Sequence, residues 1–109
     1  MKIGEYNFEI KEGMVQRDLE SFFTHLRRLE VQEYEDDKGR KRMEERKASP
    51  ERNGDYLRAG LRSKIMIIEI EGESLRFEDI DDLDPRVTVT MAGAWNEFLT
   101  ELMTPIVPN

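Results

Sequence analysis

Residues 84–102, DPRVTVTMAGAWNEFLTEL, carry the clearest helix signal of the chain. Asp84 can cap a helix, and Pro85 suits the first turn, where a missing backbone N–H costs nothing. Apolar residues then recur at a period near 3.6, namely at Val87, Met91, Ala94, Trp95, Phe98 and Leu102. This spacing predicts an amphipathic helix that ends near Met103 and turns its apolar stripe inward.

Two further segments share the helical period. The first predicted helix starts at Val15, and its apolar positions are Val15, Leu19, Phe22, Phe23, Leu26 and Leu29. The second is expected to start at Ser49-Pro50, a cap residue followed by proline, and to end near Ser63. Gly60 weakens this helix relative to alanine, and we interpret it as a position where another backbone approaches closely.

The first twelve residues alternate between apolar and polar. Tyr6, Phe8 and Ile10 share one side, which is the period of a half-buried strand. A tight turn over residues 3–6 would complete an N-terminal β-hairpin.

Residues 65–70 fit two structures. Their four isoleucines favour a strand, yet Ile65 and Ile68 also continue the helical period of the preceding segment. We prefer a strand up to Ile70, followed by a turn at 71–74 and a short returning strand at 75–77. Residues 78–83 are then expected to form a single helical turn that buries Ile80 and Leu83.

Between Glu33 and Lys47, twelve of fifteen residues are charged. Such a segment buries too little apolar area to offset its ordering entropy, so we expect residues 33–48 to be a mobile loop or a solvated helical extension. Residues 104–109 should form an extended tail, because prolines stand at 105 and 108.

The predicted architecture is a single small α+β domain over residues 1–109. It has an N-terminal β-hairpin, two or three amphipathic helices, and a short central strand or hairpin.

Composition limits the possible functions. The chain has 17 basic and 24 acidic residues, a net charge of −7, which argues against nucleic-acid binding. There is no cysteine and one histidine, which leaves no disulfide framework and no multi-histidine zinc site. No apolar run approaches 18 residues, and the first residues lack an apolar signal core. We therefore expect a cytoplasmic protein that uses no cofactor or metal and has no catalytic residues, with partners other than nucleic acid or membrane.

The acidic segment 69–84 holds eight acids and one base. Its net charge of −7 equals the net charge of the whole chain. A calcium loop starting at Asp79 would need glycine at its sixth position and glutamate at its twelfth, where Asp84 and Thr90 stand instead. We interpret the segment as a solvated loop beside a capped helix. The other interpretation is a surface for a basic partner, with Asp79, Asp81 and Asp82 as the contact residues.

The basic segment 38–47 has six lysines or arginines and no interleaved aromatic residue, so it is not suited to stacking on bases. It is either a solvated stretch or a segment that orders on contact with a partner. His25 stands on the first predicted helix, and we interpret it as a residue at the edge of the core.

Several stretches together resemble the tail assembly chaperones of long-tailed bacteriophages. The order is YLRAGLR at 56–62, a short apolar run, a Glu-Gly-Glu turn at 71–73, then FEDIDDLDP at 77–85 and a helix. A short strand pair bearing Gly4-Glu5-Tyr6 and a Pro-Asn ending are also similar, so the resemblance covers residues 1–29 and 56–109. Residues 65–70 depart from it, because they hold isoleucines where an aromatic residue is expected.

The resemblance implies a non-enzymatic assembly factor that binds tape-measure and tail tube proteins. An apolar groove for such a client would come from Phe22, Phe23, Met91, Trp95 and Phe98. The expected behaviour is client binding or self-association through an apolar face. Two alternatives remain open: an acidic phage-encoded inhibitor that binds a basic site on a host protein, and a small virion connector.

Overall fold

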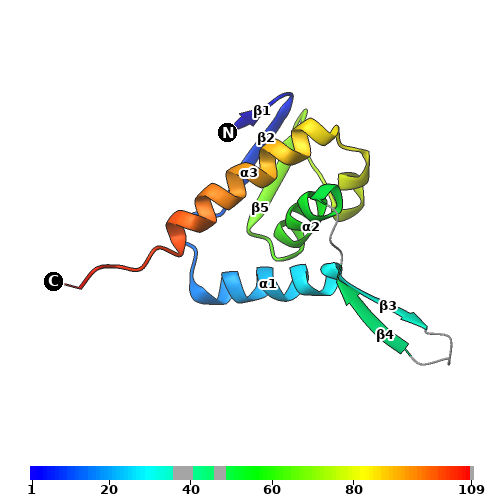
Figure 1. Cartoon of the computed structure of the whole chain (residues 1–109). Coiled ribbons are helices and arrows are strands. Elements are labelled where there is room, and N and C mark those ends of the chain that lie inside the picture. Colours follow the sequence, from blue (N-terminus) through cyan, green and yellow to red (C-terminus); the bar gives the residue numbers. More distant parts are fainter. Residues whose placement is uncertain (36–40, 46–48, 109) are drawn as a thin grey trace.

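The computed structural model describes residues 1–35, 41–45 and 49–108, and its helices and strands confirm the predicted α+β class (Figure 1). The strands are β1 Lys2–Ile3, β2 Tyr6–Ile10, β3 Val31–Glu35, β4 Lys41–Glu45, β5 Met66–Ile70 and β6 Glu73–Ser74. The helices are α1 Gln16–Glu30, α2 Ser49–Arg62, the 3-10 helix η1 Phe77–Asp82 and α3 Pro85–Leu102.

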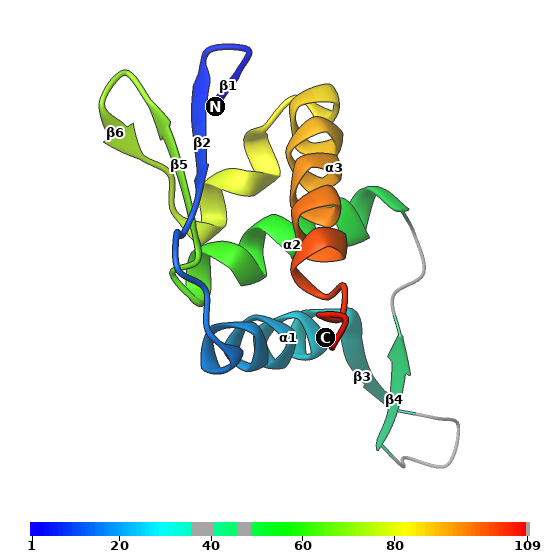
Figure 2. The same cartoon turned by 90° about the vertical axis from the view of Figure 1, so that its left-hand side faces the viewer.

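Four strands form one antiparallel sheet in the order β1-β2-β5-β6. The predicted N-terminal hairpin is confirmed, and Gly4 supplies the positive φ of 60° that its two-residue turn needs. Phe8 stands opposite Ile68 in the register, and both are buried, whereas the neighbouring pair Glu9 and Ile67 is exposed. One face of the sheet therefore packs on the core, and α2 and α3 lie on that side (Figure 2).

The junction of α2 with β5 explains why residues 65–70 could not be assigned from their period. The N–H of Ile65 donates to the carbonyl of Gly60 at 3.1 Å, and the N–H of Lys64 donates to that of Leu61 at 3.2 Å. This pair of bonds is a Schellman motif, and Lys64 takes its left-handed position with φ of 62°. The motif ends the helix at Arg62, so the preferred interpretation of a strand up to Ile70 is confirmed.

The second hairpin is shorter than predicted. Glu71 and Gly72 both have positive φ, as a two-residue type I′ turn requires, and the returning strand is Glu73–Ser74 rather than residues 75–77. The predicted start of the returning strand is two residues late, because the predicted turn spans four residues and the observed turn spans two. The predicted helical turn after it is confirmed as η1, which buries Ile80 and, next to its end, Leu83.

The charged segment departs most from its prediction. The expectation of a loop or a helical extension over residues 33–48 is wrong where residues are described, because β3 and β4 pair as an antiparallel hairpin from Val31 opposite Glu45 to Glu35 opposite Lys41. Backbone pairing between strands needs no apolar side chains, so the composition gave no sign of it. Residues 36–40 and 46–48 lie outside the described part. The hairpin projects from the end of α1 (Figure 1).

The three α-helices enclose a core that centres on Trp95. Its ring centroid lies 4.7 Å from that of Phe22 on α1 and 5.8 Å from that of Phe98, one turn along α3. Beyond Met103, the C-cap of α3, the chain leaves the body as the predicted tail. Within the described residues, no helix is both long and apolar enough to cross a lipid bilayer.

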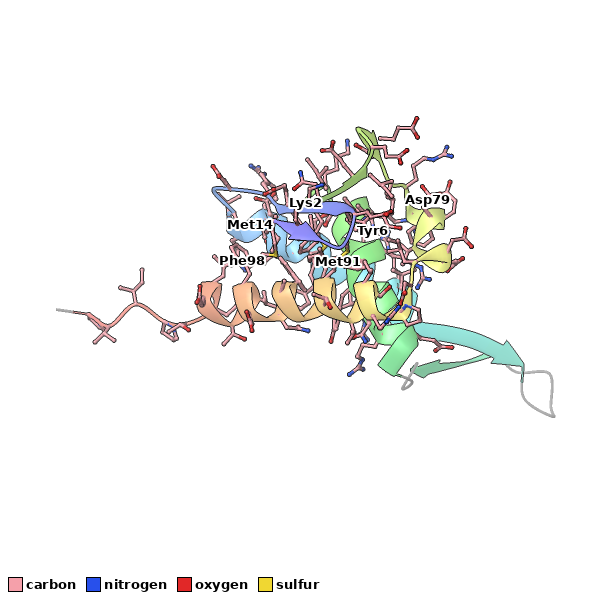
Figure 3. All side chains as sticks on the ribbon, turned by 90° about the horizontal axis from the view of Figure 1, so that it is seen from above. Lys2, Tyr6, Met14, Asp79, Met91 and Phe98 are labelled. Atoms are coloured by element: carbon pink, nitrogen blue, oxygen red, sulfur yellow. The ribbon has the colours of Figure 1, made fainter. Side chains whose placement is uncertain are left out.

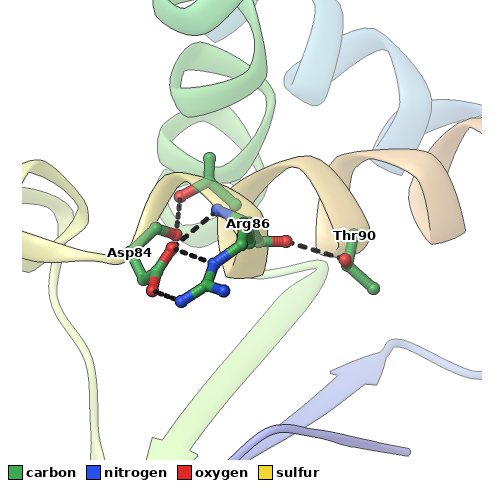
Figure 4. Close-up of polar contacts among 4 residues, drawn as sticks. Asp84, Arg86 and Thr90 are labelled. Atoms are coloured by element: carbon green, nitrogen blue, oxygen red, sulfur yellow. Dashed lines mark hydrogen bonds and ion pairs between the residues drawn. The ribbon is translucent and has the colours of Figure 1, made fainter.

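The start of α3 is capped as predicted (Figure 4). Asp84 accepts a hydrogen bond from the backbone N–H of Arg86 at 2.9 Å, and its carboxylate also pairs with the Arg86 guanidinium at 2.9 Å. The hydroxyl of Thr90 donates to the carbonyl of Arg86 one turn later. The bonds from the Arg86 side chain and backbone lower the pKa of Asp84 below its ordinary value of 3.8.

This cap predicts an acid-sensitive contribution to stability. A carboxylate whose pKa is lower in the folded state stabilises the fold above its unfolded-state pKa, and that stabilisation is lost as the pH falls below about 3.8. Asp84→Asn keeps a capping oxygen but does not titrate, so its Tm should fall less steeply than that of the wild type below this pH. Thermal melts between neutral pH and pH 2.5 or so measure the slopes. The control, Asp82→Asn, removes an exposed carboxylate nearby, and equal slopes for both variants would contradict the prediction.

Candidate functional site

The predicted apolar groove of five side chains lies mostly inside the protein. Phe22, Met91 and Trp95 have no exposed surface, so they are core residues and offer no contact to a partner, contrary to the prediction. The reason is that the apolar stripes of α1 and α3 pack on each other through Phe22 and Trp95. Phe23 remains 41% exposed and Phe98 is half-buried, and the side chains of Met91 and Phe98 point from α3 toward the body (Figure 3).

The four aromatic side chains nonetheless form one connected row. Phe23 contacts Phe22 edge-on at 5.2 Å between centroids, Phe22 contacts Trp95, and Trp95 stacks on Phe98. The row therefore runs from a partly exposed residue on α1 through the core to α3. The structure brings these predicted residues together, but as packing and not as a surface.

The three predicted acidic residues lie on different sides of η1. A 3-10 helix has three residues per turn, so Asp79 and Asp82 align on one side and Asp81 lies on another. Asp79 caps the helix by accepting the N–H of Arg76 at 2.7 Å, and Asp81 pairs with Arg58 on α2. Asp82 is exposed. The acids therefore do not present one continuous contact surface, and two of the three hold local structure.

A groove of about 790 Å³ opens where the end of α1, the first half of α2, η1 and the start of α3 meet. Its apolar lining comes from Leu29, Phe77, Ile80, Leu83, Pro85 and Val89. Its polar lining includes Glu51, Asn53, Asp55, Arg58, Asp81, Arg86 and Thr88. This combination of an apolar floor and charged rim is typical of a binding site.

Arg58 organises the wall of this groove. Its guanidinium donates to the buried Asp55 at 3.0 Å and also to Asp81, so it ties α2 to η1. The guanidinium of Arg62, one turn along α2, lies 3.8 Å from the centre of the Phe77 ring, a cation–π contact. This network was not predicted from the sequence. Its signal is the spacing of 55, 58 and 62, which puts one acid and two arginines on one face of a helix.

A second exposed apolar surface lies at the other end of α3. Met103 is 59% exposed, and Ile106 and Val107 in the tail are 94% and 83% exposed. Pro105 and Pro108 flank the latter two, and the tail points away from the body, opposite the β3–β4 hairpin (Figures 1 and 3). The extended tail was predicted from the sequence, but no role was predicted for it.

Titratable groups give few candidates for chemistry. In the part of the chain that the structure describes, no three His, Asp or Glu side chains lie close enough to hold a metal ion. His25 is half-buried at the edge of the core. Among the groups with a shifted pKa, Asp18 is a partly buried residue in the first turn of α1: the backbone N–H of Val15 and the ammonium of Lys11 lower its pKa.

Comparison of the chain with models of protein families, with curated proteins and with solved structures gives no significant match.

Proposed function

We propose that this chain is a non-enzymatic protein-binding factor, namely a tail assembly chaperone of a long-tailed bacteriophage, as the resemblance in the order of its sequence stretches implies. Its clients would be the tape-measure and tail tube proteins, bound in the cytoplasm of the host cell during tail assembly. The observation that carries the proposal is the exposed apolar tail beyond α3.

Large apolar side chains that stay in water are costly unless a partner covers them. Ile106 and Val107 are almost fully exposed on an extended backbone, which is the form in which a short segment can lie along a client. The prolines on either side reduce the entropy that such a segment loses on binding. The net charge of −7 would keep the free protein soluble while this surface is uncovered.

Threonine at both Ile106 and Val107 should impair client binding without weakening the fold, because the two side chains are almost wholly exposed. With the wild type, co-expression should raise the soluble fraction of the tape-measure protein encoded nearest to it. With the double variant, this increase should be largely lost, while the Tm stays the same. Fractionation by centrifugation and a thermal melt measure the two quantities.

The matched control is Ile67→Thr, another replacement of a β-branched residue, at a half-exposed position of the sheet. It should leave the client as soluble as the wild type does. If the wild type has no effect on the client, the proposed function is wrong. If the tail variant performs like the control, the tail is not the contact.

A further inference from the structure

A second hollow, of about 530 Å³, lies where the end of α2, strand β5 and residues 74–77 meet. Its apolar floor includes Leu61, Leu75 and Phe77, which are half-buried and therefore keep apolar area in contact with water. A partner side chain that entered the hollow would remove this area from water, which is favourable. The hollow therefore offers a place for one large apolar side chain.

The charged residues around this hollow are mostly basic. Arg62, Lys64 and Arg76 are exposed and Glu69 is the single acid of the lining, so three positive charges face one negative charge and the net charge is +2. Within the part of the chain that the structure describes, none of the three cations forms an ion pair with a carboxylate. We call this site the basic hollow, and its cations are open to a partner.

Seven of the eight acids of segment 69–84 lie outside this lining: Glu71, Glu73, Glu78, Asp79, Asp81, Asp82 and Asp84. Of these, Glu73, Asp79 and Asp82 line a separate hollow, whose described lining includes no basic residue. Ser74 and Leu75 line both hollows. The two signs of charge are therefore separated, with basic residues on one side of this stretch of chain and acidic residues on the other.

The basic residues are also held in place. The guanidinium of Arg62 lies 3.8 Å from the centre of the Phe77 ring, and Lys64 has its backbone fixed in the left-handed position of the Schellman motif. Three carbonyls near the end of α2 accept the backbone N–H groups of Ser63, Lys64 and Ile65, so they have partners without these basic side chains. Fixed cations lose less freedom when they bind an anionic group, which favours binding.

We propose that the basic hollow binds an acidic segment of a protein partner, in which carboxylates flank one large apolar side chain. Guanidinium groups bind carboxylates through strong charge-assisted hydrogen bonds, and the apolar floor receives the side chain between them. A long polyanion such as nucleic acid is disfavoured, because beyond the hollow it would meet a protein with a net charge of −7. The proposal goes beyond the proposed function and does not depend on it, since it involves neither the tail nor the tape-measure client.

The probe is a short fluorescent peptide whose central leucine is flanked on both sides by glutamates. A second peptide replaces every glutamate with lysine, and a third replaces the leucine with serine. Anisotropy titrations of the full chain should show binding of the first peptide, weaker binding of the third and none of the second, and binding should weaken as salt is raised. Absence of binding by the first peptide, or equal binding of any two, would overturn the proposal.

Two double variants locate the site. Lys64→Gln with Arg76→Gln removes two cations from the basic hollow, and Lys2→Gln with Arg17→Gln removes two exposed cations that do not line it. Both double variants change the net charge equally, so a general electrostatic effect is matched. The first should weaken binding of the glutamate peptide by about fivefold or more, and the second by less than about twofold. Equal weakening would show that only overall charge is sensed, and the basic hollow would be excluded.

Two further measurements test other occupants of the basic hollow. If a single-stranded oligonucleotide displaces the glutamate peptide at an equal or lower concentration, the site takes polyanions and the proposal is wrong. If the chain alone sediments as a dimer that Lys64→Gln with Arg76→Gln dissociates, a second copy occupies the hollow and the proposal is also wrong. A monomer from which the oligonucleotide does not displace the peptide is the expected result.

Discussion

Trp95→Ala is expected to lower the free energy of unfolding by about 3–5 kcal/mol, the usual cost of deleting a buried aromatic side chain. The indole has no exposed surface and contacts aromatic rings on both sides, Phe22 and Phe98. Domains of this size are stable by only about 5–15 kcal/mol, so the variant should be close to the limit of folding. Guanidinium unfolding followed by far-UV circular dichroism measures the change, because the variant has lost the only tryptophan.

Trp95→Phe is the informative control. The indole Nε1–H is buried and has no hydrogen-bond partner among the described residues, a deficit that costs about 1–3 kcal/mol. Phenylalanine removes this donor and keeps a ring between Phe22 and Phe98, so the loss should be clearly smaller than for alanine. An alanine variant within about 1 kcal/mol of the wild type would show that Trp95 is not the centre of the core.

Gly60→Ala is expected to destabilise the protein although alanine is the better helix former. Propensity alone would favour alanine by about 1 kcal/mol. A Cβ at this position of α2 would, however, overlap the sulfur of Met66, and both residues are buried. Overpacking of this kind costs about 1–3 kcal/mol, so the net change should be a loss. The close approach predicted at Gly60 is present, but it is made by a side chain and not by another backbone.

Gly93→Ala is the matched control, since nothing lies within 4 Å of a Cβ at this exposed position of α3. It should stabilise the protein by about 0.5–1 kcal/mol, the pure effect of propensity. In a Met66→Ala background, Gly60→Ala should no longer be destabilising, because its obstacle has been removed. Chemical unfolding of the four proteins of this cycle, and of Gly93→Ala, tests the account. Destabilisation by Gly60→Ala that persists without Met66 would contradict it.

The elements that could be predicted from the sequence are those with a local signal. Asp84-Pro85 marks the start of α3, and the alternation of residues 1–12 marks β2, because caps and periodicity are properties of a few neighbouring residues. The end of α2 has a weaker signal: the left-handed residue is Lys64, where glycine would have been diagnostic. Placing β3 and β4 required knowledge of a backbone pairing within a highly charged stretch, from Glu35 opposite Lys41 to Val31 opposite Glu45.

The same distinction applies to the candidate site. The apolar stripe with Met91 and Trp95 was predicted correctly as inward-facing, but periodicity does not say whether another helix covers it. Phe22 on α1 covers this stripe by packing on Trp95, and that contact joins residues far apart in the sequence. The groove was missed for the same reason. It is assembled from four elements, and its ion pair between Arg58 and Asp81 spans 23 positions.

The two outermost strands of the four-stranded sheet, β1 and β6, are each two residues long. Edges this short give an incoming strand little backbone to pair with, which protects a sheet from being extended by foreign chains. A chaperone of the proposed kind would meet polypeptides with exposed strands and would have to avoid pairing with them into fibrils. In the proposed function, the short edges would leave side-chain contacts as the way in which the molecule holds a client.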